Sequence, residues 1–307
     1  MEQKESIKHR LRTINQKFVV AILEALAHLP LRVLYVLADL LYYPVAYVFH
    51  YRRKVIDDNL RHSFPEKSVD ELALLRKKYY RHFCDLAVET IKLSRISEAE
   101  IEKRYHYTNP EVFSEPLPSQ KGMIVLAMHY SNWEWGIILP KHLEQTILMV
   151  YNQMRDNVPF DNFLEDSRKR WGGVAVVMSR AARVSMDYKR RNEPAMLWLA
   201  ADQSAPHDAQ FWMRFLNREA PFFAGPVKLA QKLNQPIYFQ RVKKLSRGMY
   251  ESDFTLLIEE PAKVEASVIL GIYIQKMEEV IRETPEYYLW SHRRWKHKRP
   301  EGTELMV

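Results

Sequence analysis

Four short apolar runs, separated by amphipathic stretches of about 10 to 20 residues, constrain the fold of this chain more than any other feature. The runs are MIVLAM from Met123, TILMV from Thr146, VAVVM from Val174 and AMLWLA from Ala195. Strand-like runs that alternate with helical stretches are typical of βαβ units around a parallel sheet. We therefore expect an α/β fold, with a largely parallel or mixed central sheet flanked by helices.

Further elements are predicted on both sides of these runs. Apolar residues at helical spacing predict a helix from Ser68 to Leu93, and Ser97 begins a short acidic helix. The segments FWMRF, PIYFQRVKK and YESDFTLLIEE have strand character, and the turn at Ser246 to Gly248 predicts a hairpin between the last two. A closing helix is expected over 266–283, before an aromatic and basic tail.

The first 50 residues have a different character. The chain is strongly apolar from Phe18 to Phe49, but Pro30 divides the region and Asp39 lies within its second half, so that a membrane-spanning helix is marginal. Basic residues flank the region at Lys8, Arg10, Arg12, Lys17, Arg52, Arg53 and Lys54. Together with its tyrosines, this pattern favours membrane-associating helices over 1–50 and an α/β domain over 51–307. The alternative is a helical pair buried in a soluble core.

Charge, cysteine content and the absence of certain motifs limit which partners and cofactors we expect. The net charge of +8 and pI near 9.3 favour a negative partner, such as nucleic acid, an anionic membrane or an acidic carrier protein. The single cysteine, Cys84, excludes an intramolecular disulfide and fits a reducing compartment. There is no CxxC, HExxH or glycine-rich phosphate loop, so we expect no metal and no nucleotide cofactor.

The segment HYSNWE, which follows MIVLAM directly, is the candidate catalytic motif. Ligands of α/β sheets bind beyond the carboxyl ends of the strands, and His129 lies there. A chain reversal could bring the Glu134 carboxylate to the imidazole, fix its tautomer and leave the other ring nitrogen to act as a base. Ser131 and Glu134 also have the spacing of a helix capping box. The local pattern alone leaves both interpretations open.

Several blocks in order carry a resemblance to a known family. HYSNWE resembles the HX4D/E motif of the lysophospholipid acyltransferase superfamily, and most closely its bacterial lipid A late acyltransferase branch. The other similar blocks are YRRKVIDDNLRHSFPE from Tyr51, DSRKRWGG around Arg168, LWLAADQ through Asp202, FLNREAPFFAGPVKLA from Phe215 and the tail PEYYLWSHRRWKHKRP. The resemblance covers most of the chain.

The resemblance implies a specific enzyme. It implies transfer of a fatty acyl group from acyl carrier protein to a hydroxyl of a lipid A precursor, at the cytoplasmic face of the bacterial inner membrane, without a cofactor. His129 would be the base and Glu134 its orienting partner. Arg168 would contact phosphate or assist the oxyanion, and Asp202, which follows the strand AMLWLA, would position the acceptor or the base.

Two other functions remain open at this stage. The acceptor could be another membrane lipid, such as a lysophospholipid or an aminoacyl lipid. Alternatively, the tail WSHRRWKHKR, in which tryptophans alternate with basic residues, could belong to a membrane-binding or nucleic-acid-binding protein without catalysis. No helix-turn-helix, zinc-finger or RNP pattern accompanies this tail, so we do not expect nucleic acid as the partner. The sequence does not predict the length of the acyl chain.

Overall fold

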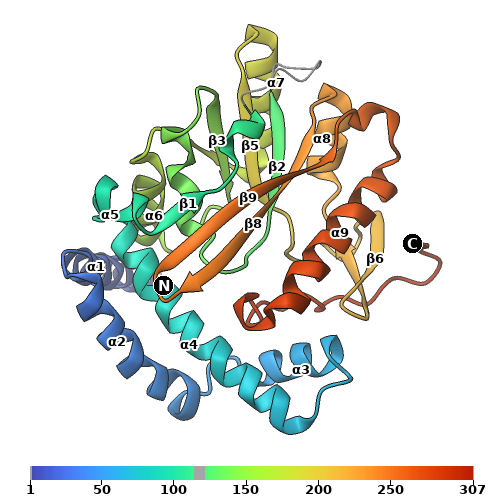
Figure 1. Ribbon diagram of the computed structural model, residues 1–307. Coiled ribbons are helices and arrows are strands. Elements are labelled where there is room, and N and C mark those ends of the chain that lie inside the picture. The colour runs from blue at the N-terminus through green and yellow to red at the C-terminus, as the bar shows by residue number, and fades with distance from the viewer. Residues whose placement is uncertain (1, 114–121, 307) are drawn as a thin grey trace.

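The computed structural model describes residues 2–113 and 122–306, with side chains from Arg12 onward, so Lys8 and Arg10 lie outside the described side chains. Figure 1 shows a central sheet with helices packed around it. The helices are α1 (Glu2–Ala27), α2 (Leu31–Tyr43), α3 (Arg53–Ser63), α4 (Val69–Leu93), α5 (Glu98–Glu102), α6 (Val158–Lys169), α7 (Ala181–Arg191), α8 (Gly225–Leu233) and α9 (Ala266–Glu283). Shorter helical segments are the π-helix η1 (Pro44–Val48) and the 3-10 helices η2 (Pro110–Phe113), η3 (Glu134–Lys141), η4 (Met178–Arg180), η5 (Pro261–Lys263) and η6 (Pro285–Tyr287).

The strands form one large and one small sheet. They are β1 (Tyr105–Tyr107), β2 (Met123–Ala127), β3 (Thr146–Tyr151), β4 (Val174–Val177), β5 (Ala195–Ala200), β6 (Phe211–Phe215), β7 (Arg218–Phe222), β8 (Ile237–Ser246), β9 (Met249–Ile258) and β10 (Leu305–Met306). The large sheet has the order β1-β9-β8-β2-β5-β3-β4, and the small sheet has the order β10-β6-β7. In the large sheet only the β8–β9 hairpin is antiparallel. The α/β fold with a largely parallel central sheet is therefore confirmed.

The register of two neighbouring strands positions the candidate site. β2 pairs with β5 in parallel, and Ala127 at the end of β2 lies opposite Ala200 at the end of β5. His129 and Asp202 each follow two residues later. β2 is buried along its whole length, as expected for a parallel strand covered on both faces. The sheet therefore brings the ends of two predicted strands together at its carboxyl edge.

The N-terminal helices pack on α4. α2 lies along α4, and α1 contacts α4 and α6 (Figure 1). Leu31, Leu34 and Ala38 of α2 are buried, whereas other apolar side chains face outward, among them Leu40, Tyr43, Val48 and Phe49. Residues Leu31–Val48 form a helical stretch long and apolar enough to cross a membrane, and only 28% of it is buried. This stretch therefore packs on α4 along one side and presents most of its residues outward.

One predicted element takes another form. The helix expected after the HYSNWE motif is the 3-10 helix η3, which contains Gly136 and Pro140. Proline lacks an N–H group, and its ring clashes with the carbonyl four residues earlier, so a regular α-helix is disfavoured here. The 3-10 helix η3 ends at Lys141, one residue after Pro140. Glu134 therefore begins a short, irregular turn instead of the first turn of a long α-helix.

Candidate active site

His129 and Asp202 form the central contact of the site. The imidazole Nδ1 lies 2.7 Å from Oδ1 of Asp202, and the His129 backbone N–H donates to the same oxygen at 3.1 Å. Asp202 is nearly sealed, with 2% of its side chain exposed, whereas 21% of the His129 side chain is exposed. The imidazole is therefore anchored at Nδ1 and accessible on its other side.

His129 and Asp202 each favour the charged form of the other. Burial lowers the pKa of His129, but the negative charge of Asp202, the hydrogen bond to it and the charge of Glu134 outweigh burial, so this pKa lies above its usual value. Burial raises the pKa of Asp202, but the His129 charge and its two hydrogen bonds bring this pKa below the usual value. Asp202 thus stays ionised and stabilises the imidazolium form of His129.

The second ring nitrogen faces a side-chain amide. Nε2 of His129 lies 3.2 Å from Nε2 of Gln203, the residue after Asp202. With Nδ1–H donating to Asp202, the lone pair of Nε2 accepts from the amide. In this neutral tautomer the Nε2 lone pair lies on the side that a substrate would approach, and a hydroxyl that replaced the Gln203 amide could give its proton to Nε2.

Glu134 binds a different partner from the one expected. Both of its carboxylate oxygens accept from Nη2 of Arg168, at 3.2 and 3.4 Å, and Trp133 Nε1 donates to it at 3.2 Å. The structure shows no hydrogen bond from the described imidazole of His129 to Glu134, and Nδ1 contacts Asp202 instead. Glu134 reaches His129 only through its charge. Arg168 and Glu134, about 16% and 15% exposed, form an ion pair at the rim of the site.

Ser131 and Glu134 do not form a capping box in the described structure either. Ser131 has a left-handed backbone, with φ of 55°, and its buried hydroxyl finds no hydrogen-bond partner among the described residues. Asn132 caps the turn instead, because its Oδ1 accepts from the backbone N–H of Trp135 at 3.0 Å. The sequence left open whether Glu134 caps a helix or contacts His129. In the structure it does neither and forms an ion pair with Arg168.

A buried carboxylate that sequence reasoning missed holds Asn132. Glu89 of α4 is fully buried and accepts from Asn132 Nδ2 at 2.8 Å, Tyr35 Oη at 2.7 Å and Tyr250 Oη at 2.7 Å. Burial raises the pKa of Glu89, and the hydroxyl donors offset burial only in part. This network ties the turn after β2 to α2, α4 and β9. A polar residue in an amphipathic helix gives no signal of such a role.

A cavity of about 580 Å³ opens in front of His129. Its wall is mostly apolar and includes Ile137, Met149, Leu164, Leu197, Leu199 and Phe223. The polar lining residues include His129, Glu134, Arg168 and Gln203, together with His292 and Lys296 of the tail. The volume is in the range of small-molecule sites. A mostly apolar wall with these polar groups suits a long aliphatic chain whose reactive group lies at the imidazole.

The tail is part of this site instead of a free basic surface. Trp290 and Arg294 are almost fully buried, and Trp295 stacks on Phe215 with ring centroids 5.8 Å apart. The Trp290 ring is buried and Trp295 packs against Phe215, so both tryptophans of this segment contribute to the packing of the tail. Nε2 of His292 accepts from the backbone N–H of Ser204 at 3.3 Å, and burial lowers the pKa of His292 to about 4. His292 thus stays neutral beside the cavity.

The described side chains offer no obvious metal centre. Nowhere in residues 12–113 and 122–306 do three His, Cys, Asp or Glu side chains converge on one point. The chemistry available at the site is that of an oriented imidazole, an ionised carboxylate and a nearby guanidinium.

Comparison with known proteins is consistent with this arrangement. The family described as bacterial lipid A biosynthesis acyltransferase matches residues 1–297. No match was found among curated proteins.

Proposed function

Because this chain belongs to the bacterial lipid A biosynthesis acyltransferase family, we propose that it transfers a fatty acyl group from acyl carrier protein to a hydroxyl of a lipid A precursor. The observation that carries the proposal is the His129–Asp202 pair, which faces a largely apolar cavity. A thioester carbonyl is electrophilic enough for direct attack, so an oriented base suffices. No acyl-enzyme intermediate is needed.

The reaction would proceed in two proton transfers. Nε2 of His129 removes the proton of the acceptor hydroxyl as its oxygen attacks the thioester carbonyl carbon. The resulting imidazolium is stabilised by Asp202 at Nδ1, a contact of 2.7 Å. When the tetrahedral intermediate collapses, the carbon–sulfur bond breaks, and the imidazolium returns its proton to the departing thiolate. The products are an ester and a free thiol.

The Glu134–Arg168 pair would act beside this reaction. Arg168 lines the cavity, and Glu134 fixes its guanidinium through two contacts. A guanidinium there could stabilise the oxyanion or bind a phosphate of a substrate. Glu134 is therefore proposed to orient Arg168, while Asp202 orients the base.

Membrane attachment and charge support the same assignment. The apolar surface of α2 and η1 would lie at the cytoplasmic face of the inner membrane. At the end of this surface, Val48 and the following residue Phe49 are 69% and 75% exposed. The net charge of +8 favours an acidic donor protein and a phosphorylated acceptor. Both substrates would then meet a protein of the opposite charge.

Mass spectrometry of lipid A from a deletion strain and its parent tests the function. We expect the deletion strain to lose one acyl chain, wild-type protein and a His142→Ala control to restore it, and His129→Ala to fail. General-base catalysis supplies about 10² to 10⁴-fold in rate, so purified His129→Ala should lose at least that much turnover. Unchanged lipid A after deletion would refute the lipid A assignment, whereas turnover retained by His129→Ala would reject His129 as the base.

A further inference from the structure

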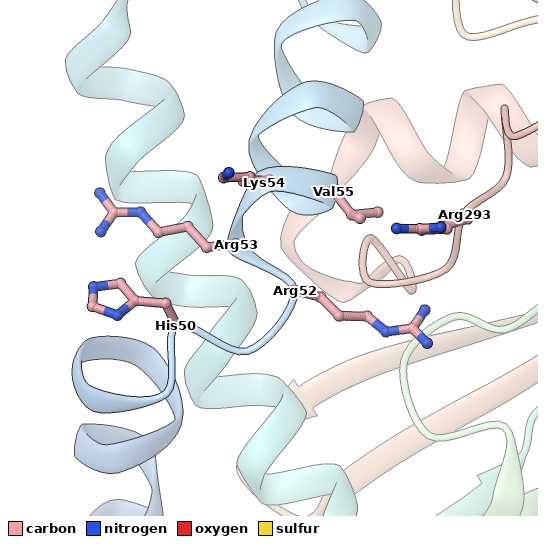
Figure 2. Close-up of a pocket in the computed structure, with 6 residues that line it drawn as sticks. All are labelled: His50, Arg52, Arg53, Lys54, Val55 and Arg293. Carbon is pink, nitrogen blue, oxygen red and sulfur yellow. The ribbon is translucent and has the colours of Figure 1, made fainter.

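A second cavity, separate from the catalytic one, lies where the N-terminal apolar region meets α3. It measures about 520 Å³ and is lined by His50, Arg52, Arg53, Lys54, Val55 and Arg293 (Figure 2). None of these lining residues is acidic. Figure 2 shows Arg52 and Arg293 on one side of the turn that precedes α3, with His50 and Arg53 on the other. The proposed acyl transfer uses none of them.

The positive charge of this cavity is only partly balanced. Arg53 lies 3.6 Å from Asp57, but Asp57 also binds Arg76 at 2.5 Å. Within the described part of the chain, Lys54 and Arg293 have no ion-pair partner. Cations gathered in one place repel one another unless an anion joins them. The arrangement therefore has the composition of an anion site.

The backbone of the turn is held in an unusual conformation. His50 and Arg52 both have left-handed backbones, with φ of 47° and 50°. Non-glycine residues seldom adopt this region, and such residues persist where the surrounding structure holds them. Here Nη1 of Arg52 donates to the Ser291 carbonyl at 2.9 Å. This bond uses one of the five N–H groups of the guanidinium and leaves others to bind a ligand.

The position of the cavity indicates where its ligand comes from. The turn directly follows the exposed apolar residues Tyr47, Val48 and Phe49, which would bring it to the level of lipid headgroups. On its other side, Arg293 is adjacent in sequence to His292, which lines the catalytic cavity. The basic cavity thus adjoins the exposed apolar residues on one side and, through the Arg293–His292 pair of neighbours, shares the tail with the catalytic cavity.

We propose that this cavity binds the terminal phosphate of a lipid headgroup, with Arg52 and Arg293 as its main contacts. Arginine suits this ligand because its planar fork matches the oxygens of phosphate. The phosphate could belong to the lipid acceptor or to a neighbouring lipid of the bilayer. Only the first assignment rests on the proposed acyl transfer.

Vesicle binding tests the proposal without any reaction. The full chain is bound to phosphatidylcholine vesicles that contain either phosphatidate or oleate, matched in surface potential so that diffuse attraction is equal. We expect tighter binding to phosphatidate, and loss of this preference by about fivefold for each of Arg52→Gln and Arg293→Gln. The control Arg183→Gln/Lys232→Gln, on α7 and α8 at the opposite end of the molecule in Figure 1, should keep the preference.

The substitutions are chosen so that misfolding cannot explain the result. Arg293 is exposed and its side chain contacts no partner in the described structure, so Arg293→Gln should leave the melting temperature unchanged. Arg52→Lys keeps the charge but loses the fork, and should recover only part of the preference. Equal binding of the wild type to both vesicles, or the same preference in Arg293→Gln, would overturn the proposal.

A transfer assay then assigns the source of the phosphate. If the acceptor supplies it, Arg293→Gln should raise KM for the phosphorylated acceptor and leave KM unchanged for the same lipid after phosphatase treatment. If a bilayer lipid supplies it, KM should rise equally for both acceptors. Because vesicle binding requires no turnover, failure of the cavity proposal and failure of the proposed reaction remain distinguishable.

Discussion

Two buried carboxylates hold the HYSNWE segment from opposite sides, and they do so by different physics. Asp202 contacts an imidazole, and its pKa is lowered despite burial, because a group that can become positive lies 2.7 Å away. Glu89 contacts two hydroxyls and an amide, and its pKa is raised because burial outweighs both these donors and the positive charge of Lys244. Asp202 therefore keeps a charge next to the base, whereas Glu89 is a hydrogen-bond acceptor whose burial favours its protonated form.

Asp202 and Glu89 illustrate how a carboxylate that acts on a base can be distinguished from a structural one. Both are almost fully buried, so burial alone does not distinguish them. The partner decides, because only a titratable partner that faces a cavity can turn a buried charge into an effect on reactivity. His129 is partly exposed to such a cavity, while Asn132, the partner of Glu89 in the same segment, is sealed.

Asp202→Asn should give the largest effect. Without the carboxylate, the imidazole loses its orientation and its stabilising charge, and we expect kcat to fall by about 10² to 10⁴-fold. The base must be neutral, so activity rises with pH through the His129 pKa, which lies above its usual value in the wild type. With the charge gone, burial dominates, and the acidic limb of the kcat/KM profile should move to lower pH. A limb that stays in place would contradict the role given to Asp202.

Glu134→Gln and Arg168→Gln should have an intermediate effect. Each breaks the same pair of contacts, so we expect about a tenfold loss of kcat/KM for each and nearly the same loss for the double variant. Glu134 also raises the His129 pKa, but after Asp202 in strength. The acidic limb should therefore shift less in Glu134→Gln than in Asp202→Asn. Losses that simply add would show that the two residues act separately.

Glu89→Gln should have the smallest effect on turnover, about twofold or less, because the amide keeps the shape of the network. The effect of this substitution should instead be seen in the pH dependence of the free energy of unfolding. A carboxyl whose pKa is raised on folding binds more protons in the folded state, so the free energy of unfolding falls as pH rises from the unfolded pKa, near 4.3, towards the folded pKa. Melting curves should show any advantage of the wild type over Glu89→Gln shrinking across this interval. An advantage that grows with pH would mean that Glu89 is ionised.

The sequence patterns predict part of this arrangement, but not all of it. The patterns predicted β2 to β6, β8 and β9, the closing helix over Ala266–Glu283 and the positions of His129 and Asp202 at strand ends, but not the short strands β1, β7 and β10. The patterns alone did not predict that the two residues meet, because 73 residues separate them and the order of strands in a sheet is set by tertiary packing. The resemblance implied that Asp202 positions the acceptor or the base, and it named Glu134 as the orienting partner, for which the local pattern left a capping role open. Glu89, 43 residues before Asn132, carries no local signal at all.

The hydroxyl of Tyr35 gives the Glu89 network a further consequence. Tyr35 belongs to α2, the helix with an outward apolar surface, and its bond to Glu89 continues through Asn132 to the turn that carries the base. Three successive side chains thus join the helix with the outward apolar surface to the turn that carries His129. A fragment that begins at α3 would lose the Tyr35 donor to one oxygen of the buried Glu89 carboxylate, while the bond from Asn132 to the other oxygen would remain. Any surface that holds α2 against α4 would therefore also favour the ordered form of this turn.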